Sequence, residues 1–292
     1  MPAPAPLEGV KRVLVLHGYM QNAVILSKRL DAIRRVCGSK IEFCCLDAPI
    51  VLKPTDAESY NDNPQAVFDA INPTNDPTLA PRAWWNGSRL DAGVKGLENT
   101  FSFLRDILSR EKLDGVLGFS QGATLAAILS AMLERPENYP NILINGLPPH
   151  PPFEFCVAMS GFKHPDPYLS SILDATFNTR TLHVIGRRDT LTDPAMSFTL
   201  VDVSLNRRVE MHDWGHIVPW QDDWPRFLFE WIMDPNGDVP APKVSGMDDD
   251  VLSEELRQSA SNSGAKTSLD SSDSQVGGAA LSCQPNNLVA KL

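Results

Sequence analysis

The sequence predicts an α/β fold with a mostly parallel six-stranded sheet and helices on both faces. Short, almost continuously apolar runs recur along residues 1–234, as in strands that are covered on both sides. Between them lie longer stretches with apolar residues at every third or fourth position, which is typical of helices packed on a sheet. The alternation of the two patterns indicates successive βαβ units with right-handed crossovers.

The expected elements follow one another in a regular order. Strands are predicted at residues 11–16, 41–46, 114–117, 155–161, 181–186 and 207–211. Helices are predicted at residues 23–36, 90–110, from after Ser120 to about 133, 194–200 and 222–233. Gly38 supplies the stop of the first helix. We therefore expect residues 1–234 to form one α/β domain.

One internal segment, residues 51–92, has a different character. Prolines interrupt any long helix or strand there, at positions 54, 64, 73, 77 and 81, and the segment also carries Trp84-Trp85. Long irregular insertions in compact domains usually serve function, so we expect a lid or a pocket wall. The alternative is a loop whose two tryptophans fill the core.

The end of the chain changes composition again. Residues 235–292 are rich in Ser, Asp, Gly and Asn, with eight acidic and four basic residues, so this part carries 4 − 8 = −4 of the total charge of −10. Such a segment buries too little apolar surface to offset its ordering entropy. We expect a disordered acidic tail without a catalytic role.

Composition excludes several classes of function. The net charge of −10 argues against nucleic acid or an anionic membrane as the main partner, because both require a basic surface. No apolar run approaches the roughly 20 residues that span a bilayer, and the N-terminus lacks the pattern of a secretory signal. The five cysteines form no C-x-x-C pair and are typical of buried thiols in a reducing compartment, so a cytoplasmic location is expected.

The clearest motif is Gly118-Phe119-Ser120-Gln121-Gly122. An apolar strand precedes it and an Ala/Leu-rich helix follows, which is the context of a G-x-S-x-G nucleophile elbow. A serine on a strained strand-to-helix turn needs neighbours without side-chain bulk, and the two glycines provide them. The following helix directs its positive end toward the serine.

A nucleophilic serine needs a base and a group that orients the base, here in the chain order Ser, Asp or Glu, His. Asp189 fits the acid because it follows the strand predicted at 181–186. Asp193 is the competitor, and it could equally cap the next helix. His216 fits the base because it follows the last strand and stands beside Gly215. His212 is its rival, and its place directly after that strand suits support of the loop.

An oxyanion requires two main-chain N–H donors. One is expected from Gln121 and the other from the loop after the first strand, at Tyr19 or Met20, between which the sequence does not choose. His17 could orient that loop by hydrogen bonding, or it could be purely structural. Neither a metal site nor a glycine-rich phosphate loop is recognisable, so no cofactor is expected.

Several separate motifs resemble the FSH-type serine hydrolases, a branch of the α/β hydrolases with fungal and animal members. They are Leu16-His17-Gly18-Tyr19-Met20-Gln21-Asn22, Asp47-Ala48-Pro49, Arg82-Ala83-Trp84-Trp85, the elbow, and Gly215-His216-Ile217-Val218-Pro219. The resemblance covers about residues 10–233. It implies an α/β-hydrolase fold, a Ser120–Asp189–His216 triad, and carboxylesterase or thioesterase activity. Some fungal members resemble thioesterases that release or edit polyketides.

The expected substrate is a small-molecule acyl ester or thioester, free or bound to a carrier protein, with Trp84 and Trp85 as candidate pocket residues. Two alternatives remain at this point. An acyltransferase would use the same acyl-enzyme with a different acceptor, and a hydrolase-shaped binding protein would use the pocket without turnover.

Overall fold

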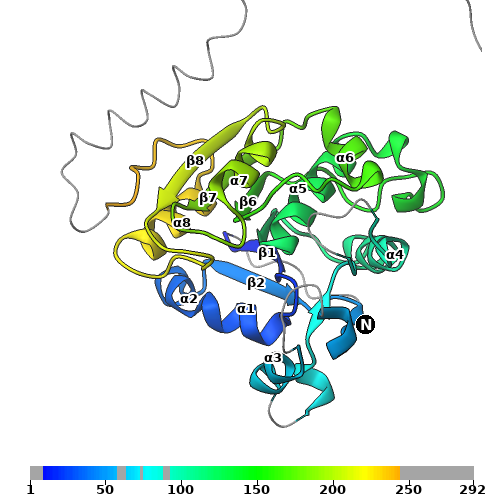
Figure 1. Ribbon diagram of the computed structural model, residues 1–292. Helices are drawn as coiled ribbons and strands as arrows, with labels where there is room; N and C mark the ends of the chain where they lie inside the picture. Colours follow the sequence, from blue (N-terminus) through cyan, green and yellow to red (C-terminus); the bar gives the residue numbers. More distant parts are fainter. Residues whose placement is uncertain (1–8, 58–63, 73–74, 88–92, 244–292) are drawn as a thin grey trace, which may run out of the picture. The chain divides into compact units, whose positions relative to one another are not determined.

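The computed structural model describes residues 9–57, 64–72, 75–87 and 93–243 of the chain (Figure 1). These residues belong to one compact unit, which comprises Met1–Ser245. The tail predicted from residue 235 lies outside the described residues from position 244 onward. Residues 235–243 are described, and they run along the sheet: Arg180 Nε donates to the carbonyl of Pro235 (2.9 Å), and Arg208 Nη1 donates to that of Val239 (2.7 Å).

Six parallel strands form the central sheet, in the order β2-β1-β5-β6-β7-β8. Their bounds are β1 Lys11–Leu16, β2 Ile41–Leu46, β5 Gly115–Phe119, β6 Phe155–Met159, β7 Arg180–Gly186 and β8 Arg207–His212. The fold class predicted from the sequence is confirmed. Because β1 and β5 are neighbours although they are far apart in sequence, the loop after β1 and the elbow after β5 emerge side by side.

Helices cover both faces of this sheet (Figure 1). On one face, α1 (Ala23–Arg29), α2 (Asp31–Cys37) and α8 (Trp224–Met233) pack on Val13 and Val15 of β1. On the other face, α4 (Leu97–Leu108), α5 (Gln121–Glu134), α6 (Pro167–Asp174) and α7 (Pro194–Val201) pack on the side of Leu14 and Leu16. The alternation of side chains along β1 thus separates two apolar cores.

Three helices differ from the sequence prediction. The helix expected at residues 23–36 is two helices, because Leu30 (φ −86°, ψ 0°) leaves the helical conformation between α1 and α2. The helix expected from residue 90 begins at Leu97, after Gly96 with φ of 86°, and residues 88–92 lie outside the described chain. Helix α6 was not predicted; Asp166 caps it by accepting hydrogen bonds from the N–H groups of Tyr168 and Leu169.

The described part of the proline-rich segment folds into short elements. They are a 3₁₀ turn at Pro54–Ala57, helix α3 at Pro64–Ile71 and a second 3₁₀ turn at Pro77–Leu79. Strands β3 (Ile50–Val51) and β4 (Arg82–Ala83) pair antiparallel and close the segment into a loop. Arg82 N–H donates to the carbonyl of Gln21 (2.8 Å), which joins the end of this loop to the segment after β1.

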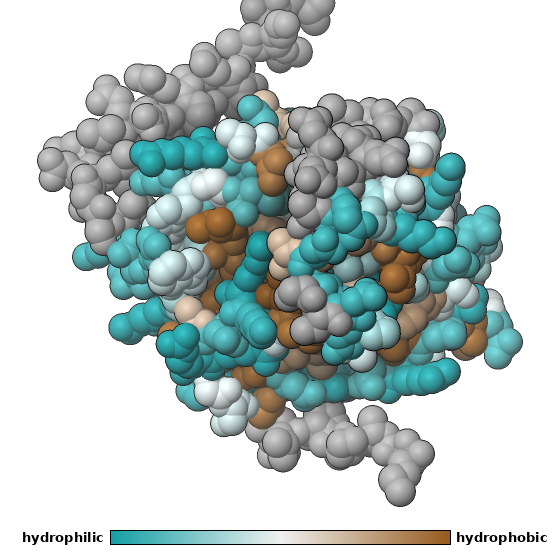
Figure 2. Space-filling model, turned by 60° about the horizontal axis from the view of Figure 1, so that its bottom comes forward, coloured by the Kyte–Doolittle hydropathy of each residue, from teal (hydrophilic) through white to brown (hydrophobic). Residues whose placement is uncertain are grey.

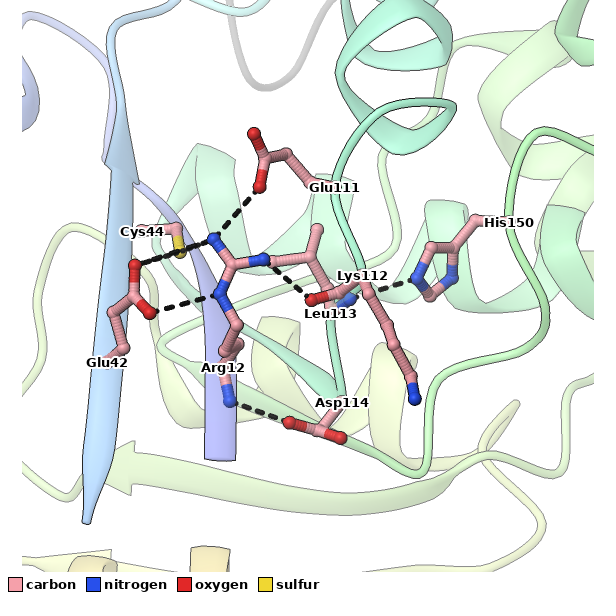
Figure 3. A network of polar contacts seen from close by, with 8 residues as sticks. All are labelled: Arg12, Glu42, Cys44, Glu111, Lys112, Leu113, Asp114 and His150. Atoms are coloured by element: carbon pink, nitrogen blue, oxygen red, sulfur yellow. Dashed lines mark hydrogen bonds and ion pairs between the residues drawn. The ribbon is translucent and has the colours of Figure 1, made fainter. Parts of the chain in front are cut away.

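A polar network ties the strands together at their amino ends (Figure 3). The Arg12 guanidinium contacts the carboxylates of Glu42 (3.0 Å) and Glu111 (2.9 Å), and its Nη1 donates to the carbonyl of Lys112 (2.9 Å). Arg12 N–H also donates to Asp114 Oδ2 (2.7 Å). The network therefore links β1, β2 and the entry to β5 at the amino ends of the strands, whereas the elbow lies at their carboxyl ends.

The surface is mixed in character. On the face drawn in Figure 2, apolar side chains form several patches separated by hydrophilic ones. No helix within the described ranges is long and apolar enough to cross a membrane.

Candidate active site

Ser120 lies at the carboxyl end of β5, between the strand and the first turn of α5. Its backbone has φ of 54° and ψ of −119°, a conformation that a non-glycine residue rarely adopts. The turn is held by hydrogen bonds on both sides: Ser120 N–H donates to the carbonyl of Met159 (2.8 Å), and its own carbonyl accepts from Ala123 N–H (2.9 Å). The strand-to-helix context predicted for the motif is present.

The two glycines of the elbow are required by close backbone contacts. A Cβ atom on Gly118 would stand 2.1 Å from the carbonyl oxygen of Gly122, and one on Gly122 would stand 2.1 Å from that of Leu16. Both distances are far below van der Waals contact between such atoms. Only glycine lets the start of α5 pack directly on β5 and on the end of β1, and that packing fixes where Ser120 projects.

The carboxylate of Asp189 contacts the imidazole of His216 directly, with 2.7 Å between Oδ2 and Nδ1. Its other oxygen accepts hydrogen bonds from the N–H groups of Leu191 (2.9 Å) and Thr192 (2.8 Å). Burial alone would raise the pKa of this carboxyl, but the hydrogen bonds from His216 and Thr192 outweigh it and hold the pKa below its ordinary value. Asp189 is therefore an oriented anion beside the imidazole.

The competitor Asp193 occupies a different role. Its side chain accepts a hydrogen bond from Ala195 N–H (2.7 Å) and caps α7. The other histidine of the loop, His212, is completely buried, and its Nδ1 accepts from Trp214 N–H (3.3 Å). Burial lowers the pKa of His212 to about 4, so this imidazole is neutral near pH 7 and supports the loop that carries His216.

Ser120 and His216 face the same cavity, although no hydrogen bond joins their side chains in the described structure. The imidazole of His216 packs on the ring of Phe119, with 4.7 Å between ring centroids, and 15% of its side chain is exposed. Because Nδ1 is engaged by Asp189, Nε2 is the nitrogen available to the serine hydroxyl. Catalytic hydrogen bonds of this type are often long before substrate binds.

The cavity has a volume of about 390 Å³ and a mixed apolar and polar lining. It is lined by Gly18, Tyr19, Met20, Gln21, Arg29, Trp85, Gly87, Phe119, Ser120, Gln121, Phe162, His164, Leu191, Thr192 and His216. Trp85 thus forms part of the wall, whereas Trp84 does not line the cavity. Trp84 is fully buried, and its indole N–H donates to the carbonyl of His17 (2.8 Å).

Two residues that line the cavity with Ser120, Met20 and Gln121, are candidates for main-chain anion donors. Met20 has φ of 61°, and its N–H, like that of Gln121, donates to no partner among the residues that the structure describes. Both residues line the cavity, one on the loop after β1 and one at the first position of α5. Tyr19, the other candidate on the first loop, lines the same cavity but lacks the positive φ of Met20.

His17 holds this first loop in place. Its Nδ1 contacts the carbonyl of Gly18 (2.8 Å), and its Nε2 accepts a hydrogen bond from Ala48 N–H (3.1 Å). The imidazole is completely buried, and burial lowers its pKa to about 4, so it is neutral near pH 7. His17 therefore has the orienting role that the sequence left open.

The side chain of Gln121 is a functional feature that the sequence reasoning missed. Its Oε1 accepts from Trp84 N–H and its Nε2 donates to the carbonyl of Trp85, both at 2.9 Å. The amide thus clamps the strand-like segment after β4 against the elbow. A glutamine directly after the nucleophile was the available signal, but its partners lie 36 and 37 residues away and could not be identified from spacing.

No cluster of three or more His, Cys, Asp or Glu side chains is placed to hold a metal ion within the described ranges.

Arg29 is a second lining residue that the sequence reasoning missed. Its guanidinium lies over the ring of Phe119, with 5.5 Å between Cζ and the ring centroid. As a basic residue at the end of a surface helix, it carried no pattern that marked it.

Comparison with solved structures shows the same fold. Acyl-protein thioesterase 2 of Zea mays aligns with a TM-score of 0.52 at 16% identity, over 81% of this chain and 97% of that one. Esterase PE8 aligns with a TM-score of 0.50 at 19% identity, over 80% of this chain and 95% of that one. At these identities the likeness concerns the fold alone.

Sequence relatives are closer. Esterase OVCA2 of Xenopus tropicalis is 31% identical over 216 residues, which are 72% of this chain and 86% of that protein. Two proteins of Schizosaccharomyces pombe, a dihydrofolate reductase (29% identical) and an uncharacterized hydrolase (30%), match over 72% and 71% of this chain. The match covers only 44% and 47% of their lengths. The family model described as serine hydrolase (FSH1) matches residues 7–228, and the chain therefore belongs to this family of serine hydrolases.

Proposed function

We propose that this serine hydrolase is an esterase that works through an acyl-enzyme on Ser120, with His216 as base and Asp189 as the group that orients the base. The observation that carries the proposal is the 2.7 Å contact between Asp189 Oδ2 and His216 Nδ1 beside a serine with left-handed φ in the same cavity. The arrangement supplies a nucleophile, a base and an orienting anion from the segments that follow β5, β8 and β7, at one end of the sheet.

In the acylation step, Ser120 Oγ attacks the acyl carbon while His216 Nε2 takes the hydroxyl proton. The N–H groups of Met20 and Gln121 donate to the oxyanion that forms. When the tetrahedral intermediate collapses, the bond from the acyl carbon to the leaving oxygen or sulfur breaks, and His216 gives its proton to that atom. Asp189 stabilises the imidazolium that exists between these two events.

Deacylation repeats the same proton transfers with water as the nucleophile. His216 takes a proton from the water, whose oxygen bonds to the acyl carbon, and the bond to Ser120 Oγ then breaks. The serine recovers its proton from His216, and a carboxylic acid leaves. An acyltransferase would differ only in the acceptor, so product analysis with added alcohols or amines separates the two.

The apolar part of the cavity suits an acyl chain. Met20, Trp85 and Phe162 line it, and none of them carries a charge. This supports carboxylic esters and thioesters as substrates, in keeping with the names of the esterase relatives. Release of acyl chains in a polyketide pathway stays a prediction from the resemblance.

A fluorophosphonate probe, which reacts with activated serines, tests the proposal. We expect stoichiometric labelling of the wild type, no labelling of Ser120→Ala, and labelling slowed by about 10³-fold or more in Asp189→Asn, whose amide no longer stabilises the imidazolium. Asp193→Asn is the matched control, since that carboxylate only caps α7, and it should label at the wild-type rate. Equal labelling of wild type and Ser120→Ala would refute the assignment.

A further inference from the structure

A second hollow adjoins the active-site cavity and has a different lining. Its volume is about 490 Å³, and its walls come from α1, α2 and the loop that carries His216. Arg29 and His216 line both hollows, so the two lie on either side of these side chains. We call this second hollow the basic groove, since Lys28, Arg29 and Arg35 line it together with a single carboxylate, Asp31.

The cations of the basic groove are not neutralised by the protein. Lys28, Arg29 and Arg35 are exposed, and none of them forms a salt bridge or a side-chain hydrogen bond within the described part of the chain. Arg12 at the other end of the sheet, by contrast, is bound by two glutamates. Three cations beside one carboxylate leave the groove with an excess of positive charge, which is unexpected on a chain with a net charge of −10.

The ring of Phe119 connects the groove to the reacting groups. Arg29 Cζ lies 5.5 Å from its centroid and the His216 ring lies 4.7 Å from it. A cation–π contact of this kind holds the guanidinium near the imidazole without consuming its hydrogen-bond donors. Arg29 can therefore bind an anion while it remains in place beside His216.

The position of the groove indicates which part of the substrate it receives. The residues assigned to the oxyanion and the apolar acyl wall, Met20, Gln121 and Trp85, line only the first cavity. The general acid must lie within hydrogen-bond reach of the leaving atom, so the leaving group starts next to His216 Nε2. The groove continues from His216 and thus lies on the leaving-group side.

We propose that the basic groove binds a phosphate carried by the leaving group, so that the preferred substrates are acyl thioesters of a phosphorylated thiol. The inference rests on the proposed function and names the substrate class of the same site. Guanidinium groups bind phosphate oxygens in bidentate fashion, and a lysine adds a point charge. Trp220, which is 55% exposed and lines the same groove, offers a flat surface to an aromatic base on the same arm.

A series of substrates with one acyl chain and three thiol arms tests this. Acyl-pantetheine is neutral, acyl-4′-phosphopantetheine adds a phosphate, and acyl-coenzyme A adds further phosphates and an adenine. At low ionic strength we expect kcat/KM for the phosphorylated thioesters to exceed that for acyl-pantetheine by about tenfold or more, and the ratio to shrink with added salt. A higher value for coenzyme A than for phosphopantetheine identifies the nucleotide-bearing thiol as the source of the phosphate.

Two double variants separate the groove from the general charge of the protein. Lys28→Glu/Arg35→Glu reverses two cations that line only the groove, and should abolish the preference while leaving kcat/KM for acyl-pantetheine within about twofold. Arg110→Glu/Lys112→Glu makes the same change in net charge at the amino end of the sheet and should retain the preference. Because the readout is a ratio between substrates, a loss of helix stability alone does not move it.

The two proposals fail in different ways. If the wild type hydrolyses acyl-pantetheine and both phosphorylated thioesters at equal kcat/KM, the groove assignment is wrong and the esterase proposal stands. The same holds if the two double variants alter the ratio equally. If no thioester or ester is hydrolysed and Ser120 is not labelled by fluorophosphonate, the proposed function itself is wrong.

Discussion

Three residues that follow strands at the carboxyl end of the sheet, Met20, Ser120 and Ser160, have φ between 52° and 61°. At the amino end, the residues of the Arg12 network have ordinary backbone geometry, and Arg12 contacts the carboxylates of Glu42, Glu111 and Asp114 (Figure 3). The carboxyl end of the sheet has strained main-chain turns and, among the described residues near Ser120, N–H groups without a hydrogen-bond partner. The amino end has ion pairs that join β1 to β2 and to the segment before β5. The comparison suggests that the fold's stability and its chemistry are located at opposite strand ends.

Two buried histidines sharpen this comparison because they make the same contacts. His17 and His150 each direct Nδ1 to a carbonyl of the next residue, at 2.8 and 2.6 Å. Each also accepts a main-chain N–H at Nε2, from Ala48 and Leu113 respectively, both at 3.1 Å. The same pair of contacts therefore fixes the loop after β1 at the carboxyl end of the sheet and the entry to β5 at its amino end.

The largest effect is expected at Ser120. Ser120→Ala should lower kcat by about 10⁴-fold or more, because the nucleophile is lost while the rest of the site remains. Ser120→Gly should be equally inactive, yet more stable than the wild type by about 1 kcal/mol, because glycine adopts the left-handed turn without strain. Ester turnover and urea unfolding of both variants check these outcomes. A glycine variant less stable than the alanine variant would contradict strain at the elbow.

Gly122 should be the position most sensitive to an added methyl group. We expect Gly122→Ala to lower the free energy of unfolding by about 3 kcal/mol or more, because its Cβ would overlap the carbonyl oxygen of Leu16 and nothing flexible can give way. Gly93→Ala is the control, since a Cβ at Gly93 meets no atom of the described residues within 4 Å. Similar unfolding midpoints for the two variants would rule out the close packing of α5 on β1.

Stability should also fall as the pH falls below about 6.5. Burial lowers the pKa of His17 to about 4, so the unfolded chain takes up its proton first, at the ordinary histidine pKa. The contribution is complete above pH 6.5 and is lost progressively toward pH 4, by on the order of 1 kcal/mol per pH unit for one imidazole. Denaturant unfolding between pH 7.5 and 5 measures it.

A matched pair of variants, one at each end of the sheet, measures how much each buried histidine contributes to this pH dependence of stability. His17→Asn and His150→Asn should each give a shallower slope than the wild type, since burial lowers the pKa of both imidazoles. Only His17→Asn should also reduce kcat, because only its loop carries the N–H group that we propose as an oxyanion donor. An unchanged slope in both variants would show that other groups control the acid sensitivity.

The smallest effect is expected at Arg12. Arg12→Met should cost about 1–2 kcal/mol of stability, because Glu42 and Glu111 are partly exposed and water replaces the guanidinium there. Its kcat/KM should stay within about twofold of the wild type. A loss of activity comparable to that of His17→Asn would show that the two ends of the sheet are not independent.

The sequence indicated the sheet, the elbow and the residues of the candidate site because each depends on local pattern. Apolar runs marked the strands, and the places of Asp189 and His216 after later strands put them at the end where parallel strands meet. The break at Leu30 and the start of α4 after Gly96 depend on backbone geometry that helical periodicity does not report. Helix α6 was missed although Asp166-Pro167, an N-cap residue followed by a proline at the first helical position, was an available signal.

What the sequence could not show depends on contacts between distant segments. Trp84 and Trp85 are adjacent and both belong to the buried core, yet only Trp85 also lines the cavity. No sequence pattern marked Arg29, because its place over Phe119 and beside His216 depends on how α1 packs on the sheet. Contacts between such distant segments depend on the order of the strands in the sheet, which no single sequence motif predicts.

The central claim is that the carboxyl end of the sheet performs acyl transfer through Ser120, and mass spectrometry of the intact protein during ester turnover tests it most directly. On rapid acid quenching we expect a transient adduct of the acyl mass, located on the peptide that contains Ser120 and absent from Ser120→Ala. Turnover without any adduct, an adduct on another residue, or wild-type turnover by Ser120→Ala would contradict the claim.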